Sequence, residues 1–247
     1  MNSCSTCVLL ILAGCAATKT PTQAGLRREV DRVLNTYWRG REGFVIPAKE
    51  ERRMNRHAKT DPAVYGELVS EGARRLGQEW GLCDGATSAI FADLGSGVGK
   101  LVVQSYLEWP GVKRTLGVEL SSTRAKHAWE AWESLLLSDE AFELRQMALS
   151  LVGDDEVPNP AEEVQLLKGD LLDADISEAT HVYVSSLCFP ESLMFDVTVK
   201  LKQAPRLRAA ASLQPLALSA KPRLLALPMS WTKRQGPGTI AYLYEFD

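Results

Sequence analysis

A glycine-rich loop that follows a short apolar run constrains this chain more than any other feature of its sequence. Residues 90–94 are apolar except for Asp93, and Gly95, Gly97 and Gly99 follow at alternate positions. Glycine adopts left-handed backbone angles at little cost and lets a ligand approach the main chain closely. In an α/β sheet such a loop lies beyond the carboxyl end of its strand, where ligands bind. The sequence therefore predicts a binding loop between a strand and a helix.

Strand and helix patterns alternate along the rest of the chain, which predicts a mostly parallel α/β sheet with helices on both faces. Residues 139–163 are acidic and poorly periodic, and we expect them to form a surface insertion. Residues 203–222 fit no element clearly. Apolar spacing predicts further strands at 115–119, 164–167, 181–186, 224–227 and 239–244, and helices at 24–37, 68–80, 100–108, 121–138 and 191–202.

The chain of 247 residues is long enough for one large domain. We expect residues 26–88 to form an N-terminal helical cap and residues 89–247 the ligand-binding domain. Residues 1–25 are either a targeting segment or a disordered extension. The apolar run Val8–Gly14 resembles the core of a signal peptide, but no Lys or Arg precedes it. It is too short to span a bilayer.

Charge and cysteine content limit the partners of the chain. The formal net charge of −3 provides no global basic field for nucleic acid. Residues 39–59 are the exception, with seven Lys or Arg against three acids, and form either a solvated face or a contact surface for an acidic partner. Five scattered cysteines and three histidines lack the spacing of a zinc site, so no metal is predicted.

Three acids lie at the ends of three successive predicted strands and indicate what the glycine loop binds. The loop matches neither the phosphate-loop pattern nor the G-x-G-x-x-G dinucleotide pattern. Asp93 suits a ligand with a cationic group, Glu119 lies where a carboxylate binds ribose hydroxyls, and Asp170 lies where it meets an adenine amino group. This set favours an S-adenosylmethionine pocket, and the alternative is a chance glycine-rich turn.

These and other motifs resemble the Dot1 family of histone-lysine methyltransferases. Residues 91–99 (FADLGSGVG) are similar to the family's F-x-D-L-G-S-G-V-G, 117–119 to its G-V-E, and 169–170 to its G-D. Residues 64–67 (VYGE) are similar to a loop that closes over the cofactor, and 230–232 (SWT) to the segment that lines the lysine channel.

The resemblance runs from residue 64 to 247 and implies a class I, Rossmann-like methyltransferase fold, with S-adenosylmethionine as cofactor and histone H3 or the nucleosome as substrate. It also implies a nuclear location. The basic stretch 39–59 lies outside the resemblance, and its charge makes it the candidate contact to histone H3 or the nucleosome. The implied cofactor-binding residues are Tyr65, Glu67, Asp93, Gly95, Ser96, Gly97, Gly99, Glu119 and Asp170. The implied catalytic residues are Ser185, Ser186, Phe189, Trp231, Tyr242 and Tyr244.

Two positions depart from the family pattern. The family's V-N-N-F-A-F becomes Val-Ser-Ser-Leu-Cys-Phe at 184–189, and its Gln after the glycine loop becomes Lys100. Two alternatives therefore stay open: a class I methyltransferase for another protein or a small molecule, and a non-catalytic S-adenosylmethionine-binding module. Phe189 and Trp231 are also compatible with ordinary core packing.

Overall fold

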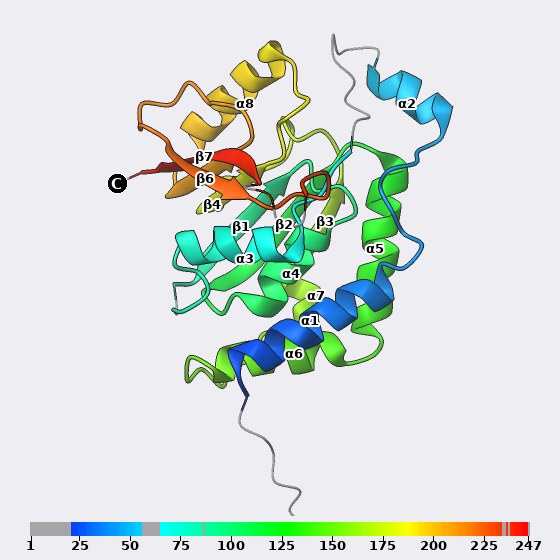
Figure 1. Ribbon diagram of the computed structural model, residues 1–247, viewed down its shortest axis with the longest axis vertical. Helices are drawn as coiled ribbons and strands as arrows, with labels where there is room; N and C mark the ends of the chain where they lie inside the picture. The colour runs from blue at the N-terminus through cyan, green and yellow to red at the C-terminus, as the bar shows by residue number, and fades with distance from the viewer. Residues whose placement is uncertain (1–20, 56–64, 86, 234–235, 237, 247) are drawn as a thin grey trace, which may run out of the picture.

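The computed structural model describes residues 21–55, 65–85, 87–233, 236 and 238–246, and contains one seven-stranded sheet (Figure 1). The strand order is β3-β2-β1-β4-β5-β7-β6, and every pairing is parallel except those of β7. The predicted mostly parallel α/β sheet is confirmed. The strands are β1 (Ala89–Leu94), β2 (Val112–Glu119), β3 (Val164–Lys168), β4 (His181–Val184), β5 (Ala209–Ser212), β6 (Arg223–Leu227) and β7 (Thr239–Glu245).

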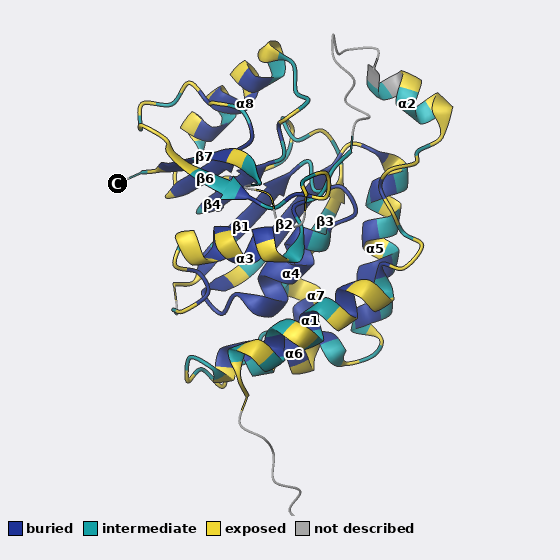
Figure 2. Ribbon diagram, in the orientation of Figure 1, coloured by how far each residue is buried: buried dark blue, intermediate teal, exposed yellow. Residues whose placement is uncertain are grey.

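Helices cover both faces of this sheet. The central strands β1, β4 and β5 are therefore buried except at Ile90, while the outer faces of the helices meet solvent (Figure 2). Helices α1, α3, α4, α5 and α6 form the layer on one face, and α8 packs on the other. The helices are α1 (Gln23–Tyr37), α2 (Ala48–Asn55), α3 (Ser70–Glu79), α4 (Lys100–Glu108), α5 (Ser122–Leu136), α6 (Glu140–Ser150), α7 (Pro160–Glu163) and α8 (Glu191–Gln203).

A buried ion network joins the N-terminal helices to the helix that follows the glycine loop. Arg74 of α3 donates to both carboxylate oxygens of Glu108 at the end of α4, at 2.7 and 3.0 Å, and to Asp31 of α1 at 2.8 and 3.1 Å. The Glu108 and Arg74 side chains are 1% and 8% exposed. Because a buried charge is tolerated only when it is paired, this network fixes α1 and α3 against α4.

The expected surface insertion at 139–163 is wrong. Helix α6 packs against α1, α4 and α5, and buries Ala141, Leu144, Ala148 and Leu149. Its pattern is weak because Arg145 lies on the same buried face. Within residues 203–222, Ala209–Ser212 forms the central strand β5, although alanine has little intrinsic preference for strands.

Arg145 is 2% exposed and closes the C-terminal end of α4. Its guanidinium donates to the carbonyl oxygens of Tyr106 at 2.8 Å, Trp109 at 3.0 Å, Pro110 at 3.5 Å and Val112. The last carbonyls of a helix have no partner within the helix. One arginine therefore provides hydrogen-bond donors for the main-chain carbonyls in the turn that leads from α4 into β2.

We expect Arg145→Leu to lower the free energy of unfolding by about 3 kcal/mol or more, because several buried carbonyls lose their donor. For a chain of this size the melting temperature falls by roughly 6–12 °C. Urea denaturation measures this effect. Arg114→Leu removes an arginine that pairs with Glu163 at a partly exposed site, and is the control, with an expected loss below about 1 kcal/mol. Equal losses in the two variants contradict the assignment.

Candidate functional site

The glycine loop between β1 and α4 folds back over the end of β2. The main-chain N–H groups of Gly95 and Ser96 donate to the carbonyl of Val118 at 2.9 and 3.0 Å. Gly95 has φ +89°, and a Cβ there would come no closer than 3.7 Å to its nearest neighbour, Phe189. Gly97 has φ +56°, and a Cβ there would lie 2.6 Å from the Tyr65 ring. The loop thus needs glycine both for its turn and for close approach.

The three predicted carboxylates come together at the carboxyl edge of the sheet. Glu119 is 6% exposed and accepts hydrogen bonds from the N–H groups of Gly97 at 2.8 Å and Ser121 at 2.7 Å. Burial raises the pKa of Glu119, and these two hydrogen bonds oppose the shift. Asp170 is exposed after β3, and one of its oxygens accepts from Leu172 N–H at 2.9 Å.

Asp93, the third carboxylate, is 3% exposed at the end of β1. Among the described residues its Oδ1 atom has no hydrogen-bond partner. Burial, and secondarily the charge of Glu119, raises the pKa of Asp93 to about 8. A buried acid without a partner is a favourable place for a cationic ligand group, because the cation offsets the cost of ionising it.

Two adjoining cavities meet at the glycine loop. The outer cavity has a volume of about 360 Å³, which lies within the usual range for small-molecule sites. The inner cavity has a volume of about 30 Å³. Tyr65, Gly66, Gly95 and Ser185 line both. The outer cavity is also lined by Glu119, Arg124, Asp170, Phe189 and Met54, and the inner cavity by Glu67, Asp93, Ser96, Gly97, Lys100 and Tyr183.

The segment Tyr65–Glu67 lies over the glycine loop and is tied down at several points. The Tyr65 hydroxyl donates to Glu67 at 2.6 Å, and the Arg124 guanidinium lies 4.5 Å from the centre of the Tyr65 ring. Glu67 also pairs with Lys100 Nζ at 2.8 Å. Its main chain exchanges hydrogen bonds with Ser230. Lys100, which departs from the family pattern, therefore holds this segment against α4.

The two predicted serines differ in their surroundings. Ser185 lines both cavities. Ser186 is fully buried, and its hydroxyl accepts from the N–H groups of Leu213 and Gln214, both at 3.1 Å. The structure therefore presents Ser185, and not Ser186, to a ligand.

The predicted aromatic residues are also spread over different surroundings. Phe189 lines the outer cavity. Trp231 is 44% exposed and packs on Gly66, where a Cβ would lie 1.9 Å from its ring. Tyr242 and Tyr244 line neither cavity, and the Tyr244 hydroxyl accepts from Leu216 N–H at 2.8 Å within the core.

Sequence reasoning missed Tyr183 and Glu50. Tyr183 gives no sequence signal because it lies in an apolar strand. Glu50 of α2 is hidden in a basic stretch, yet it accepts hydrogen bonds from the hydroxyls of Ser121 at 2.6 Å and Thr123 at 2.7 Å. Burial alone would raise the pKa of Glu50, but these hydrogen bonds outweigh it and lower the pKa. Glu50 therefore connects α2 to the start of α5, and it lines a neighbouring cavity that shares Met54, Leu120 and Asp170 with the outer cavity.

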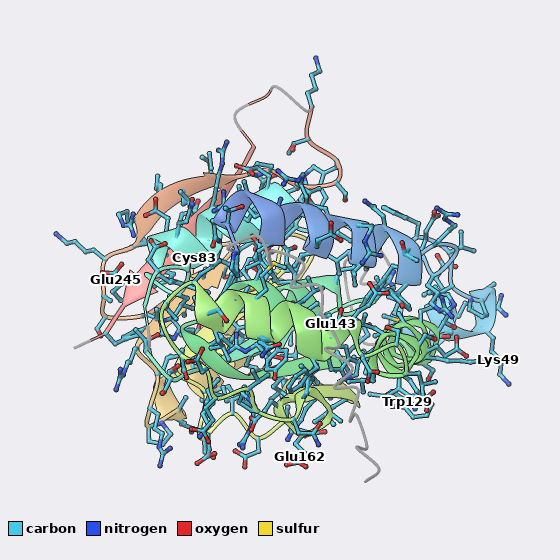
Figure 3. All side chains as sticks on the ribbon, turned by 90° about the horizontal axis from the view of Figure 1, so that it is seen from below. Lys49, Cys83, Trp129, Glu143, Glu162 and Glu245 are labelled. Carbon is cyan, nitrogen blue, oxygen red and sulfur yellow. The ribbon has the colours of Figure 1, made fainter. Side chains whose placement is uncertain are left out.

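The described part of the basic stretch, residues 39–55, includes α2, whose Met54 lines the outer cavity. Arg39, Lys49 and Arg52 are exposed, and Lys49 points away from the body of the protein (Figure 3). Arg56 and Lys59 lie outside the described residues, as does the apolar run Val8–Gly14. Within the described part of the chain, no helix is long and apolar enough to cross a membrane, and no cluster of His, Cys, Asp or Glu is arranged to hold a metal ion.

A family model for the histone methylation protein DOT1 matches residues 44–217. The matched range contains the glycine loop, the three carboxylates, Ser185 and Phe189, and ends before Trp231. No curated protein matches the sequence.

Several solved structures are similar to the chain. They include an RNA methyltransferase from Salinibacter ruber in complex with S-adenosyl-L-homocysteine, at 20% identity and a TM-score of 0.46, covering 72% of this chain and 91% of that chain. A putative RNA methyltransferase from Pyrococcus horikoshii has 12% identity and a TM-score of 0.44, covering 90% and 95%.

Asp93→Asn tests the buried acid through the stability of the protein. Between the ordinary value of 3.8 and about 8, folded Asp93 keeps a proton that the unfolded chain has lost, so the free energy of unfolding falls as the pH rises through this window. The variant lacks this loss. We therefore expect the difference in free energy of unfolding, variant minus wild type, to rise by at least about 1 kcal/mol from pH 4 to pH 8. This corresponds to roughly 2–4 °C in melting temperature.

Thermal unfolding from pH 4 to pH 8.5 measures the difference, and a difference that does not change with pH contradicts the prediction. Asp170→Asn, at an exposed carboxylate of the same site, is the control for the loss of one charge.

Proposed function

The chain belongs to the family of the histone methylation protein DOT1, and we propose that it transfers a methyl group from S-adenosylmethionine to a lysine amine of a histone. It is a methyltransferase of the class I, Rossmann-like type that depends on S-adenosylmethionine. The observation that supports the proposal is the placement of three acids around the glycine loop. Glu119 and Asp170 line the outer cavity of about 360 Å³, and Asp93 lines the inner cavity that adjoins it.

The residues of this site fit the cofactor. The outer cavity suits the adenosine part, because Glu119 retains acceptor sites for ribose hydroxyls after binding two N–H groups, and Asp170 keeps an oxygen for an adenine amine. The unpartnered Oδ1 of Asp93 suits the ammonium of the amino-acid part. Gly95 leaves the space that lets the ligand reach the loop.

The chain's own residues account for the acceptor side of the reaction. Bound S-adenosylmethionine supplies a methyl group on a positively charged sulfur. Phe189 lines the outer cavity and Trp231 covers Gly66, and we propose that the aliphatic stem of the lysine passes between these two rings. Aromatic faces also attract a developing positive charge. We assign Ser185, which lines both cavities, to accept a hydrogen bond from the lysine amine.

The histone substrate and the nuclear location are part of the proposal, and membership of the DOT1 family supports both. The exposed cations Arg39, Lys49 and Arg52 suit an acidic partner such as nucleosomal DNA, because phosphate contacts dominate such binding. One observation favours the non-catalytic alternative: Ser186 has its hydroxyl committed to Leu213 and Gln214, so a single short hydroxyl, that of Ser185, stands in place of the family's Asn pair.

Radiolabelled methyl transfer to nucleosomes, free histones and a cell extract tests the proposal. We expect label on a histone lysine, and at least a tenfold loss in Glu119→Gln, because a neutral amide is a weaker acceptor for ribose hydroxyls (about 1.4 kcal/mol per factor of ten). Label confined to other proteins or small molecules retains the methyltransferase and rejects the histone. Cofactor binding without label on any acceptor supports the binding module.

Glu50→Gln tests whether α2 helps to enclose the cofactor. The substitution weakens the hydrogen bonds to Ser121 and Thr123, and we expect the Kd for S-adenosylhomocysteine to rise by about three- to tenfold with little change in fold stability. Isothermal titration calorimetry at pH 7 measures it. Glu51→Gln, on the same helix, is the matched control. Equal affinities of the Glu50 variant and the wild type reject a role for α2.

A further inference from the structure

The inner cavity contains a second buried polar group beside Asp93. Tyr183 lies in β4, directly opposite Asp93 in the β1–β4 register. It is 2% exposed, and among the described residues its hydroxyl has no hydrogen bond of good geometry; the polar side chain beside it is that of Ser185. Burying an unpaired polar group is costly, so two such groups facing one cavity indicate that something else pairs with them.

The size of the inner cavity limits what that partner is. Its volume of about 30 Å³ admits a group no larger than one or two waters and excludes an adenine ring or a lysine stem. The outer cavity adjoins it through Gly95 and Ser185, so one end of a ligand bound in the outer cavity can reach it.

The chemistry of the lining selects a donor with several N–H groups. Asp93 and the hydroxyl oxygens of Tyr183 and Ser185 all offer acceptor sites, and an ammonium carries three donors. The charged groups around Asp93 are Glu119 from β2, and Glu67 and Lys100 along the cavity wall. Because Lys100 pairs with Glu67 at 2.8 Å, a cation that enters the inner cavity has Asp93 as its counter-ion.

We infer that Tyr183 is a cofactor-binding residue, whose hydroxyl oxygen accepts a hydrogen bond from the α-ammonium of the amino-acid end of S-adenosylmethionine, beside Asp93. This inference rests on the proposed function and adds to it a residue that determines specificity for the amino-acid end. Tyr183 packs in a cluster with Phe91 and Leu101, where a phenylalanine ring fills the same space. The hydroxyl therefore adds little to the packing, and a ligand in the inner cavity gives it a hydrogen-bond partner of good geometry.

Tyr183→Phe removes this hydroxyl alone. The test measures the Kd of three ligands by calorimetry: S-adenosylhomocysteine, its analogue without the α-amino group, and methylthioadenosine, which lacks the whole amino-acid end. We expect about a tenfold weaker Kd for S-adenosylhomocysteine and unchanged values for the other two. The variant without ligand should melt at the same temperature as the wild type or higher, because an unpaired buried hydroxyl has gone.

Tyr106→Phe is the matched control. Tyr106 is also buried, and its hydroxyl donates a hydrogen bond to the Pro158 carbonyl at 3.4 Å. Tyr106 lines neither cavity, so we expect the Tyr106 variant to bind all three ligands with the affinity of the wild type. The inference is overturned if Tyr183→Phe binds S-adenosylhomocysteine as the wild type does, or if it weakens all three ligands equally. If the wild type binds none of the three, the proposed function fails and the inference fails with it.

Discussion

The burial of two carboxylates at the ends of neighbouring central strands is the constraint on which this site depends. Glu119 is stabilised by two main-chain N–H groups, and one of them belongs to Gly97. The glycine loop thus supplies a hydrogen-bond donor to this buried carboxylate. Asp93 receives no such compensation and is held in its protonated form by burial and by the nearby Glu119. The folded chain thus bears an electrostatic cost at the place where a cationic ligand would remove it, which is a common arrangement at functional sites.

The enclosure of the site is built from contacts between segments far apart in the sequence. Lys100–Glu67 joins the start of α4 to the segment over the glycine loop, and Glu50 joins α2 to the start of α5. Each uses a charged group at a helix that borders the cavities. Lys100, which stands where the family has Gln, therefore has Glu67 as its ion-pair partner. The substitution changes the contact that holds the segment Tyr65–Glu67 over the glycine loop.

Some elements could be predicted from the sequence because their local residue pattern agrees with their place in the fold. The apolar strand before the glycine loop and the acids at the strand ends lie where the sequence predicts them. Helix α6 and strand β5 were not readable. In α6 a buried arginine interrupts the apolar face, and its partners are carbonyls 33–39 residues earlier in the chain. In β5 four small residues become a strand only because both neighbours pair with them.

The sequence by itself determined the fold class, the binding loop and the identity of the carboxylates, because glycine spacing and strand-end acids are local properties. Only the tertiary structure decided which side chains face the ligand. In the folded chain Ser185 lines the cavities whereas the Ser186 hydroxyl is bonded within the core. The Tyr244 hydroxyl is also bonded within the core, and Tyr183 lies opposite Asp93 on the neighbouring strand. The physical reason is that a hydroxyl or a carboxylate has the same chemistry wherever it stands, and its role depends on which donors and acceptors the packed chain leaves unpaired.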